Sequence, residues 1–231
     1  MNSIAQNIQS IRERVAQAAA QSNRSPEEIA LLAVSKTVSV RSISQAADSG
    51  VRQFGENRVQ EAEGKITSLR GIPDLEWHLI GHLQSNKARH AAELFDVIHS
   101  IDSVKLAAKV SEARLEIGKT MSVLLQVDLA GEETKFGADP VHVREIVEAM
   151  LGFKGIRLDG LMTIPPFFED PEDVRPYFVK LRELRDRLES EQPGCLGRRH
   201  LSMGMSHDFE IAIREGATIV RIGTAIFGAR L

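Results

Sequence analysis

An alternation of short apolar segments with helical patterns, repeated about eight times in 231 residues, constrains the fold of this chain most. The apolar segments are rich in aliphatic residues, as strands are. They are IALLAVSK, VRQFGEN, EWHLIGH, FDVIHSIDS, MSVLLQVDLA, RLDGLMTIPP, RHLSMGMS and ATIVRIGTAIFG. Several are continuous apolar runs, which is typical of strands buried on both faces of a parallel sheet. The pattern predicts repeated strand–helix–strand units.

Apolar residues at helical spacing separate most of these strands. The first such stripe, over residues 4–15, precedes every strand and predicts an amphipathic N-terminal helix. Later stripes lie in residues 40–47, 62–69, 143–150, 174–188 and 209–213. Before the stripe at 143–150, Asp139 is expected to be the N-cap and Pro140 to lie in the first helical turn.

The number of strand–helix units favours an α/β fold consisting of one eight-stranded (β/α)8 barrel, a TIM barrel, with an extra N-terminal helix. A doubly wound open sheet is the alternative. No linker, composition shift or internal repeat divides the sequence, so we expect a single domain over residues 1–231. Because FGARL follows the last strand directly, no second domain is expected after the barrel, and the N-terminal helix is expected to cover the side that lacks a final helix.

Composition indicates a soluble protein and excludes several functional classes. The chain is 42% hydrophobic and 26% charged, with a net charge of −3 and no basic stripe, which argues against nucleic-acid binding. Its one cysteine, Cys195, cannot form an internal disulfide, and the sequence shows no metal-ligand spacing, signal peptide or membrane span. We therefore expect a cytoplasmic protein without a metal. A barrel that buries its own strands favours a monomer.

The segment LLAVSKTVS places Lys36 at the end of an otherwise apolar strand. In a barrel of parallel strands, the carboxyl ends of the strands share one rim, where active sites are built. A lysine there could extend its amine into solvent. Alternatively, burial could lower its pKa and make it the nucleophilic amine of a Schiff base. Position alone does not decide between these two readings.

The last two strand–helix units favour the second reading, because they predict a phosphate site. In LSMGMSHDFEIAIREG, Ser206 is expected to begin a helix that has Asp208 in its first turn. In VRIGTAIFG, Gly223 allows a ligand to approach the backbone, and Thr224 adds a hydroxyl. Each feature has a purely structural explanation, an N-cap or a tight turn. Phosphate sites in such barrels nevertheless favour the loops after strands seven and eight.

A lysine at the first strand and a phosphate site at the last two together suggest pyridoxal 5'-phosphate (PLP). Its aldehyde would form an imine with Lys36, and Arg221 is placed to meet the pyridine nitrogen. The alternative for Arg221 is a barrel-interior charge paired with a carboxylate. Because arginine only donates hydrogen bonds, it favours an unprotonated ring nitrogen and weakens the ring as an electron sink.

The motifs LLAVSKTVS, QFGENRVQEAEGKI, EWHLIGHLQSNK, HSIDS, GLMTIPP, LSMGMSHDFEIAI and VRIGTAIFGAR closely resemble those of the pyridoxal phosphate homeostasis proteins, the YggS or PROSC family. The resemblance covers the chain from the first helix to the last arginine. It implies the barrel of the alanine racemase N-terminal domain, fold type III among PLP-binding proteins. It also implies that Lys36 carries the Schiff base, that Ser206, Gly223 and Thr224 hold the phosphate, and that Arg221 faces the ring nitrogen. Asn57 and Met203 are implied as further neighbours of the cofactor.

The segment WHLIGHLQSNK contains further polar residues near the expected rim. His78 is expected to be a hydrogen-bonded core histidine, and Trp77 a packing residue. His82 and Lys87 lie nearer the mouth, where Lys87 is either a solvated lysine or a site for a phosphate or a partner. Lys135, in the loop after the fifth strand, is a candidate for an influence on ligand exchange.

The resemblance implies a carrier or buffer that holds PLP in intracellular vitamin B6 homeostasis, with apo PLP-dependent enzymes as possible partners. The alternative is an amino-acid racemase of the alanine racemase type. Racemisation by two bases needs a second acid/base opposite the lysine, supplied in alanine racemase by a tyrosine of another domain. The only tyrosine here, Tyr177, is expected on a helix outside the barrel. A non-enzymatic role, with no catalytic residue, is therefore expected, and a scaffold or nucleic-acid module is disfavoured.

Overall fold

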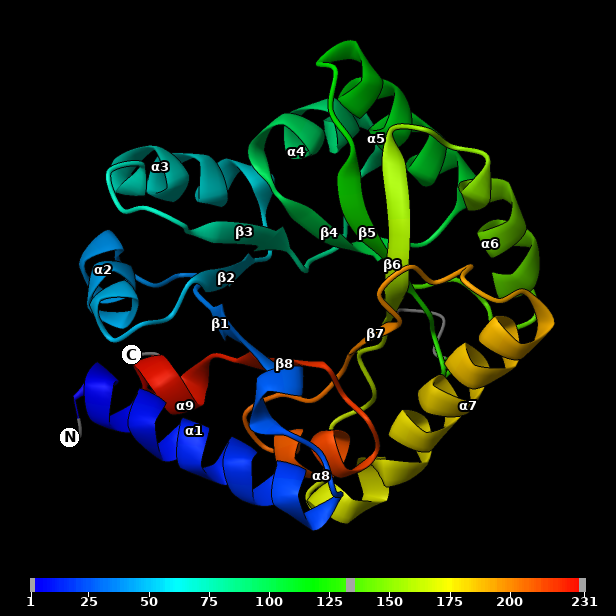
Figure 1. Cartoon of the computed structure of the whole chain (residues 1–231). Helices are drawn as coiled ribbons and strands as arrows, with labels where there is room; N and C mark the ends of the chain where they lie inside the picture. Colours follow the sequence, from blue (N-terminus) through cyan, green and yellow to red (C-terminus); the bar gives the residue numbers. More distant parts are fainter. Residues whose placement is uncertain (1–2, 132–135, 229–231) are drawn as a thin grey trace.

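The chain folds into a closed barrel of eight parallel strands, surrounded by helices (Figure 1). The computed structural model describes residues 3–131 and 136–228. Each strand pairs with the next one in the sequence, and β8 pairs with β1 to close the ring. The predicted (β/α)8 barrel is confirmed, and the open-sheet alternative is wrong.

The barrel is built from short strands that run in sequence order around the ring. They are β1 (Ala30–Val34), β2 (Gln53–Glu56), β3 (Glu76–Leu79), β4 (Val97–Ile101), β5 (Met121–Gln126), β6 (Ile156–Met162), β7 (His200–Ser202) and β8 (Ile219–Ile222). Their carboxyl ends share one rim because all strands are parallel.

A helix follows each strand, and these helices form the outer ring in Figure 1. They are α2 (Val40–Asp48), α3 (Val59–Leu69), α4 (Ala88–Leu94), α5 (Val104–Glu116), α6 (Val143–Leu151), α7 (Arg175–Glu191), α8 (Phe209–Arg214) and the one-turn α9 (Thr224–Phe227). The expected N-cap of α6 is wrong: His142 precedes the helix, and the Asp139 carboxylate accepts a hydrogen bond from the Val141 amide in a turn before it. No helix within the described ranges has the length and apolar character that a membrane span needs.

The N-terminal helix α1 (Ile4–Gln21) lies along the part of the ring that contains α8 and α9 (Figure 1). It begins with a capping box, in which Ser3 and Gln6 exchange hydrogen bonds between side chain and backbone. Its buried stripe includes Ile8 and Ile11. Because α9 is only one turn long, α1 supplies the cover for β8 that a longer final helix would give, as the sequence predicts.

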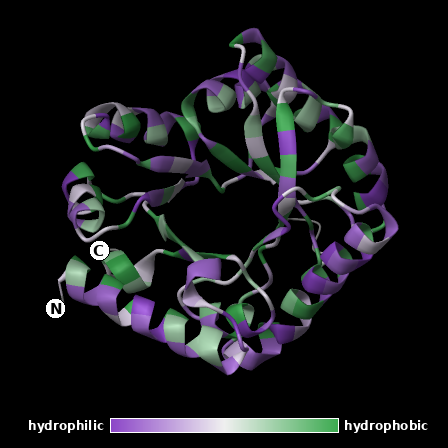
Figure 2. Cartoon of the chain, viewed as in Figure 1, coloured by the Kyte–Doolittle hydropathy of each residue, from purple (hydrophilic) through white to green (hydrophobic). Residues whose placement is uncertain are grey.

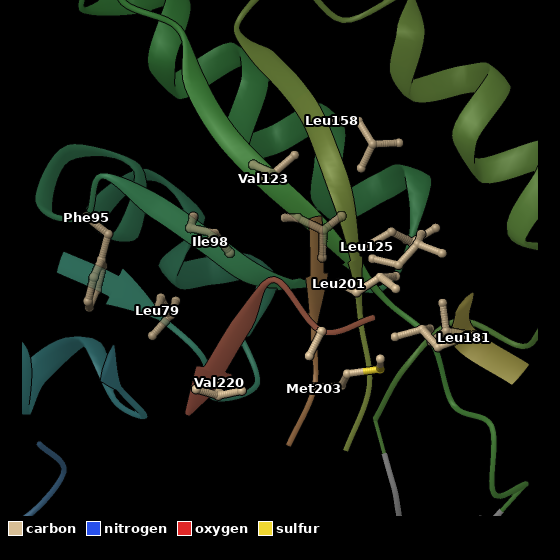
Figure 3. Packing of buried hydrophobic residues seen from close by; sticks show 14 of the residues in the cluster. Leu79, Phe95, Ile98, Val123, Leu125, Leu158, Leu181, Leu201, Met203 and Val220 are labelled. Atoms are coloured by element: carbon tan, nitrogen blue, oxygen red, sulfur yellow. The ribbon is translucent and has the colours of Figure 1, made fainter. Parts of the chain in front are cut away.

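Alternation along the strands produces two apolar layers. Outward-facing residues such as Leu79 and Ile98 pack between the strands and the helices (Figure 3). Inward-facing residues fill the barrel, where a smaller cluster contains Leu32, Leu124 and Met162. Polar residues gather on the outer sides of the helices (Figure 2). Because side chains alternate between the two layers, sequence parity decides which strand residues can reach the axis of the barrel.

Candidate functional site

A cavity of about 560 Å³ opens at the carboxyl ends of the strands, a size that suits a small-molecule ligand. Six of the seven residues predicted as cofactor neighbours line it. These are Lys36, Asn57, Ser206, Arg221, Gly223 and Thr224. They come from the two ends of the sequence, which the pairing of β1 with β8 brings together.

Lys36 reaches the cavity because of the alternation in β1. Leu32 and Val34 face the interior of the barrel, so Lys36 is the next residue with the same parity, and its half-buried side chain lines the cavity. A tight turn follows, closed by a hydrogen bond of 2.9 Å from the Val38 amide to the Ser35 carbonyl. Within this turn, Thr37 has a φ of +63°, a left-handed conformation that costs a β-branched residue about 1–3 kcal/mol.

A buried ionic cluster on the outer side of the strands supports this turn. Lys65 on α3 donates hydrogen bonds to the Ser35 carbonyl at 2.7 Å, to Glu56 at 2.9 Å and to Glu61 at 2.6 Å. The Ser35 hydroxyl also donates to Glu56, and the Thr37 amide donates to Glu61. Burial raises the pKa of Glu56, even though hydrogen bonds from Ser35 and Lys65 oppose the shift. Both residues that flank Lys36 are thus tied to α3.

Arg221 on β8 lies 3% exposed and contributes to the wall of the same cavity. Its guanidinium donates to the Ser202 hydroxyl at 2.7 Å and to the Thr163 carbonyl at 2.8 Å. Burial lowers the pKa of Arg221 to about 10, and the nearby Asp208 carboxylate opposes this shift. Both of these hydrogen-bonded partners are neutral. Arg221 is therefore not held by direct pairing with a carboxylate, which was the alternative interpretation of this residue.

Ser206 faces the turn between β8 and α9. Its hydroxyl accepts hydrogen bonds from the amides of Gly223 and Ala225, each 3.3 Å long, and exposed Thr224 lies between these residues in the sequence. These hydrogen bonds are long, so an anion that offers better acceptors could replace them. The chemistry fits a phosphate, but the helix geometry expected here is wrong. Ser206 does not begin α8, because Asp208 is the residue that precedes its first turn.

Asn57 and Met203 have different positions relative to the cavity. Asn57 is half-buried and lines it. Met203 is fully buried in the hydrophobic core (Figure 3) and does not line it, whereas Met205 does. The reason is parity: Ser202 points into the barrel toward Arg221, so Met203, the next residue, points outward.

The other polar residues of the third strand–helix unit occupy several environments. His78 is a buried core histidine, as expected, and buried Trp77 packs against Phe54 with 5.5 Å between ring centroids. His82 lines the cavity. Lys87 instead borders a smaller neighbouring pocket, and its amine donates to Gln60 at 3.3 Å. Lys135 lies outside the described residues.

Several lining residues were not predicted from the sequence. Phe136 stacks on His82 with 3.6 Å between ring centroids, and the Gln126 side chain donates to the Phe136 carbonyl at 2.6 Å. Phe167, 77% exposed, lies against His207 at the opening. These lining residues belong to loops or strand ends whose positions depend on the closed barrel. Of them, only Gln126 could have been expected, because it lies two residues after Leu124 on β5 and so faces the barrel interior as Leu124 does.

Comparison with known proteins identifies the relatives of this chain. The family model described as "Alanine racemase, N-terminal domain" matches residues 1–231. The pyridoxal phosphate homeostasis protein of Aquifex aeolicus is 47% identical over 220 residues, which are 95% of each chain. That of Pseudomonas aeruginosa is 44% identical over 230 residues, covering 100% of this chain and 97% of the relative.

Solved structures show the same fold. The structure of PipY from Synechococcus elongatus with PLP bound is 39% identical and has a TM-score of 0.87, covering 98% of this chain and all of that one. Alanine racemase from Corynebacterium glutamicum has a TM-score of 0.71 at 18% identity. This chain spans 61% of that racemase, so the likeness to it concerns the barrel alone.

Proposed function

Since the chain belongs to the family of pyridoxal phosphate homeostasis proteins, which share the N-terminal domain of alanine racemase, we propose that it binds PLP. We also propose that it takes part in intracellular PLP homeostasis as a carrier or buffer. The observation that carries the proposal is one cavity lined both by Lys36 and by the group of Ser206, Gly223 and Thr224. These residues offer an amine and an anion site to the same small molecule.

The residues of the cavity fit the chemistry of PLP. The bound cofactor supplies an aldehyde that an amine can attack, a phosphate dianion and an aromatic ring nitrogen. In the proposed complex, the amine of Lys36 would hold the cofactor covalently, with the aldehyde oxygen released as water. Ser206, Gly223 and Thr224 donate hydrogen bonds to the phosphate, and Asn57 contacts the cofactor from the end of β2. Met203 contributes only indirectly, by packing behind the β7 strand.

Arg221 is proposed to face the ring nitrogen. A guanidinium has donors and no acceptor, so it pairs with an unprotonated ring nitrogen. A ring with an unprotonated nitrogen withdraws electrons less strongly than a ring with a protonated one. This residue therefore binds and orients the cofactor, while favouring retention over turnover.

A carrier role is proposed over racemase activity. It is supported by the names of relatives that align over nearly their whole length. The placement of Tyr177 agrees, because this half-buried residue on α7 packs against Phe168 and is not among the residues that line the cavity. The racemase alternative predicts a second acid/base facing Lys36.

Three further features complete the proposal. The protein acts as a monomer, in keeping with a closed barrel in which each of the described strands already pairs with two neighbours. It works in the cytoplasm, where the buried thiol of Cys195 stays reduced. Its macromolecular partners are apo PLP-dependent enzymes rather than nucleic acids, in keeping with the net charge of −3.

The test is to incubate the protein with PLP, reduce it with borohydride and map the pyridoxyl group by peptide mass spectrometry. We expect a visible absorption band before reduction and a pyridoxyl group on Lys36 after it. Lys36→Ala should lose that site of modification, whereas the control Lys87→Ala, outside the main cavity, should keep it. Absence of PLP uptake by the wild type would refute the proposed function. Rapid racemisation of free alanine would instead favour the racemase alternative.

A further inference from the structure

A line of polar side chains crosses the interior of the barrel beneath the cavity. The His78 and His99 rings meet at 2.8 Å, between Nδ1 and Nε2 respectively. His99 Nδ1 lies 3.0 Å from the Ser202 hydroxyl, which also accepts the hydrogen bond from Arg221. At the other end, His78 Nε2 lies 3.5 Å from a carboxylate oxygen of Glu76. The line joins a buried cation at the cavity to a partly exposed anion at the amino-terminal end of β3.

The two ends of this line fix the direction of the hydrogen bonds within it. Arg221 only donates, so the Ser202 hydroxyl oxygen accepts from it, which leaves the hydroxyl hydrogen available to the His99 Nδ1 atom 3.0 Å away. Burial holds the pKa of His99 well below its ordinary value, so the ring is neutral. If Nδ1 accepts from Ser202, the one ring proton is on Nε2. That proton is donated to His78 Nδ1.

The far end agrees with this order. His78 then carries its proton on Nε2, the atom that faces Glu76. Glu76 also accepts a hydrogen bond of 2.7 Å from the Gln53 side chain, and as a carboxylate at neutral pH it can accept from His78. At 3.5 Å this contact is longer than a good hydrogen bond, and His78 Nε2 has no conventional partner within the described part of the chain. The order is therefore set mainly from the arginine end.

We propose that His99 and His78 are positioning residues for Arg221, although neither lines the cavity. In this proposal, the Ser202 hydroxyl keeps its lone pair turned toward Arg221 only because His99 Nδ1 takes its hydrogen. His99 in turn is held in the Nε2–H tautomer by His78. The line thereby fixes the orientation of the Arg221 guanidinium, which is proposed to contact the bound ligand. The part of the inference that concerns the cofactor rests on the proposed function, whereas the tautomers belong to the protein alone.

A second contact of Arg221 strengthens the assignment. Its guanidinium also donates to the carbonyl of Thr163, the residue directly after β6, so its N–H groups are held by Ser202 on β7 and by the segment that follows β6. A serine whose hydroxyl could rotate freely would be a poor anchor for a cation. With its hydrogen committed to His99, the Ser202 oxygen presents a fixed lone pair, and the guanidinium keeps one orientation.

The first test uses the protein without cofactor. Long-range ¹H–¹⁵N correlation spectra of histidine-labelled protein at neutral pH should show His99 and His78 both as neutral Nε2–H tautomers. An Nδ1–H tautomer or a histidinium at His99 would overturn the proposed order. Because no cofactor is present, this result does not depend on whether PLP binds.

The second test uses a matched pair of substitutions at His99. In His99→Asn, the amide oxygen can replace Nδ1 as acceptor for Ser202. In His99→Gln, the amide nitrogen can replace Nε2 as donor to His78, while the contact to Ser202 is lost. We expect His99→Gln to release PLP about tenfold faster, as for one lost hydrogen bond, and to shift the absorption maximum of bound PLP. We expect His99→Asn to stay within about threefold of the wild type.

A purely structural role would affect both variants equally, so equal release rates and unchanged spectra in the two would overturn the proposal. Thermal unfolding of both variants provides the control for folding. If either does not fold, Ser202→Ala replaces it, because this variant removes the link to Arg221 and leaves both histidines in place. It should also release PLP about tenfold faster, and an unchanged rate would count against the inference. Failure of the wild type to take up PLP would refute the proposed function instead.

Discussion

Lys65 joins α3 to the carboxyl ends of β1 and β2, and its replacement by methionine tests how strongly this buried cation supports the turn at Lys36. Its side chain is 10% exposed, and that of its partner Glu56 is fully buried. Methionine has a similar length and keeps the apolar contacts of the lysine stem. The substitution Lys65→Met therefore removes the charge and its hydrogen bonds with little change in volume.

The expected loss of stability follows from what remains behind. Lys65 donates to Ser35, Glu56 and Glu61, so the substitution leaves the Glu56 carboxylate with the Ser35 hydroxyl as its remaining donor in the described structure. The second carboxylate oxygen of Glu56 is already buried without a hydrogen bond among the described residues. Removing one partner of such a buried pair costs about 3–5 kcal/mol. Partly exposed Glu61 can turn to water, so its lost ion pair adds at most about 1 kcal/mol.

The loss should depend on pH. Burial raises the pKa of Glu56 above its ordinary value of 4.5, so the folded wild type binds this proton more tightly than the unfolded chain does. Stability from this group is present below pH 4.5 and is lost as pH rises through the folded-state pKa. Removing the Lys65 cation raises the pKa of Glu56 further. The deficit of Lys65→Met should therefore be smallest in acid and should grow by up to about 1.4 kcal/mol per pH unit until Glu56 ionises.

The assay is urea unfolding of the cofactor-free protein between pH 5 and pH 8, since bound ligand would add its own stabilisation. The matched control is the double variant Glu56→Gln with Lys65→Met, in which no buried carboxylate is left without its cation. We expect the double variant to be more stable than Lys65→Met at pH 8, with a smaller dependence on pH. A loss below about 1 kcal/mol that does not change with pH would refute the reasoning.

Three further predictions concern other parts of the molecule. The double variant Ser206→Ala with Thr224→Ala should weaken PLP binding about a hundredfold, as for two lost hydrogen bonds to an anion, without changing the unfolding temperature; unchanged affinity in equilibrium dialysis would exclude this anion site. Gly81→Ala should lower both PLP retention and the melting temperature measured by circular dichroism, because a Cβ at Gly81 would lie 2.3 Å from the Asn57 carbonyl oxygen. A variant with the retention and melting temperature of the wild type would contradict this close contact. Cys195, whose pKa burial raises to about 11, should react with a thiol reagent at pH 8 only after denaturant is added, and rapid labelling of the folded protein would disagree with its buried position.

The sequence allowed the barrel to be predicted from its repeated strand–helix units, and it allowed six of the residues that line the cavity to be predicted from their unusual type and position. A lysine two residues beyond an apolar strand, and an arginine within one, are conspicuous, and strand order brings Lys36 and Arg221 to one cavity. Met203 was harder to place, because its side chain direction depends on where β7 begins. Met203 directly follows Ser202, and consecutive residues of a strand point to opposite sides. Ser202 therefore points into the barrel, whereas Met203 points into the outer core.

The two polar assemblies could not be predicted from the sequence, since each exists only after distant strands pair. His99 interrupts the apolar run VIHSI, and the residues two positions before and after it, Val97 and Ile101, are apolar. Nothing near it in the sequence therefore identifies its hydrogen-bond partners. Its contacts to His78 and Ser202 are 21 and 103 residues away along the chain. Lys65 offered a slightly better signal, because Glu61 precedes it by four residues on α3. That pair alone reads as a surface ion pair, and only Glu56, pointing outward from β2, makes it a buried one.

The same alternation that separates these assemblies also connects them to the cavity. Ser35 and Lys36 are consecutive, so one faces the buried cluster on α3 while the other faces the cavity. In the same way, Ser202 faces inward to Arg221 while Met203 packs outward. The cluster therefore supports the lysine end of the cavity from outside the barrel, and the histidine line supports the arginine end from inside it. Because no residue belongs to both supports, disrupting the Lys65 cluster should impair the Lys36 turn and stability first. Disrupting the histidine line should instead alter the environment of the ring nitrogen at nearly constant stability, a separation that the two sets of variants can test directly.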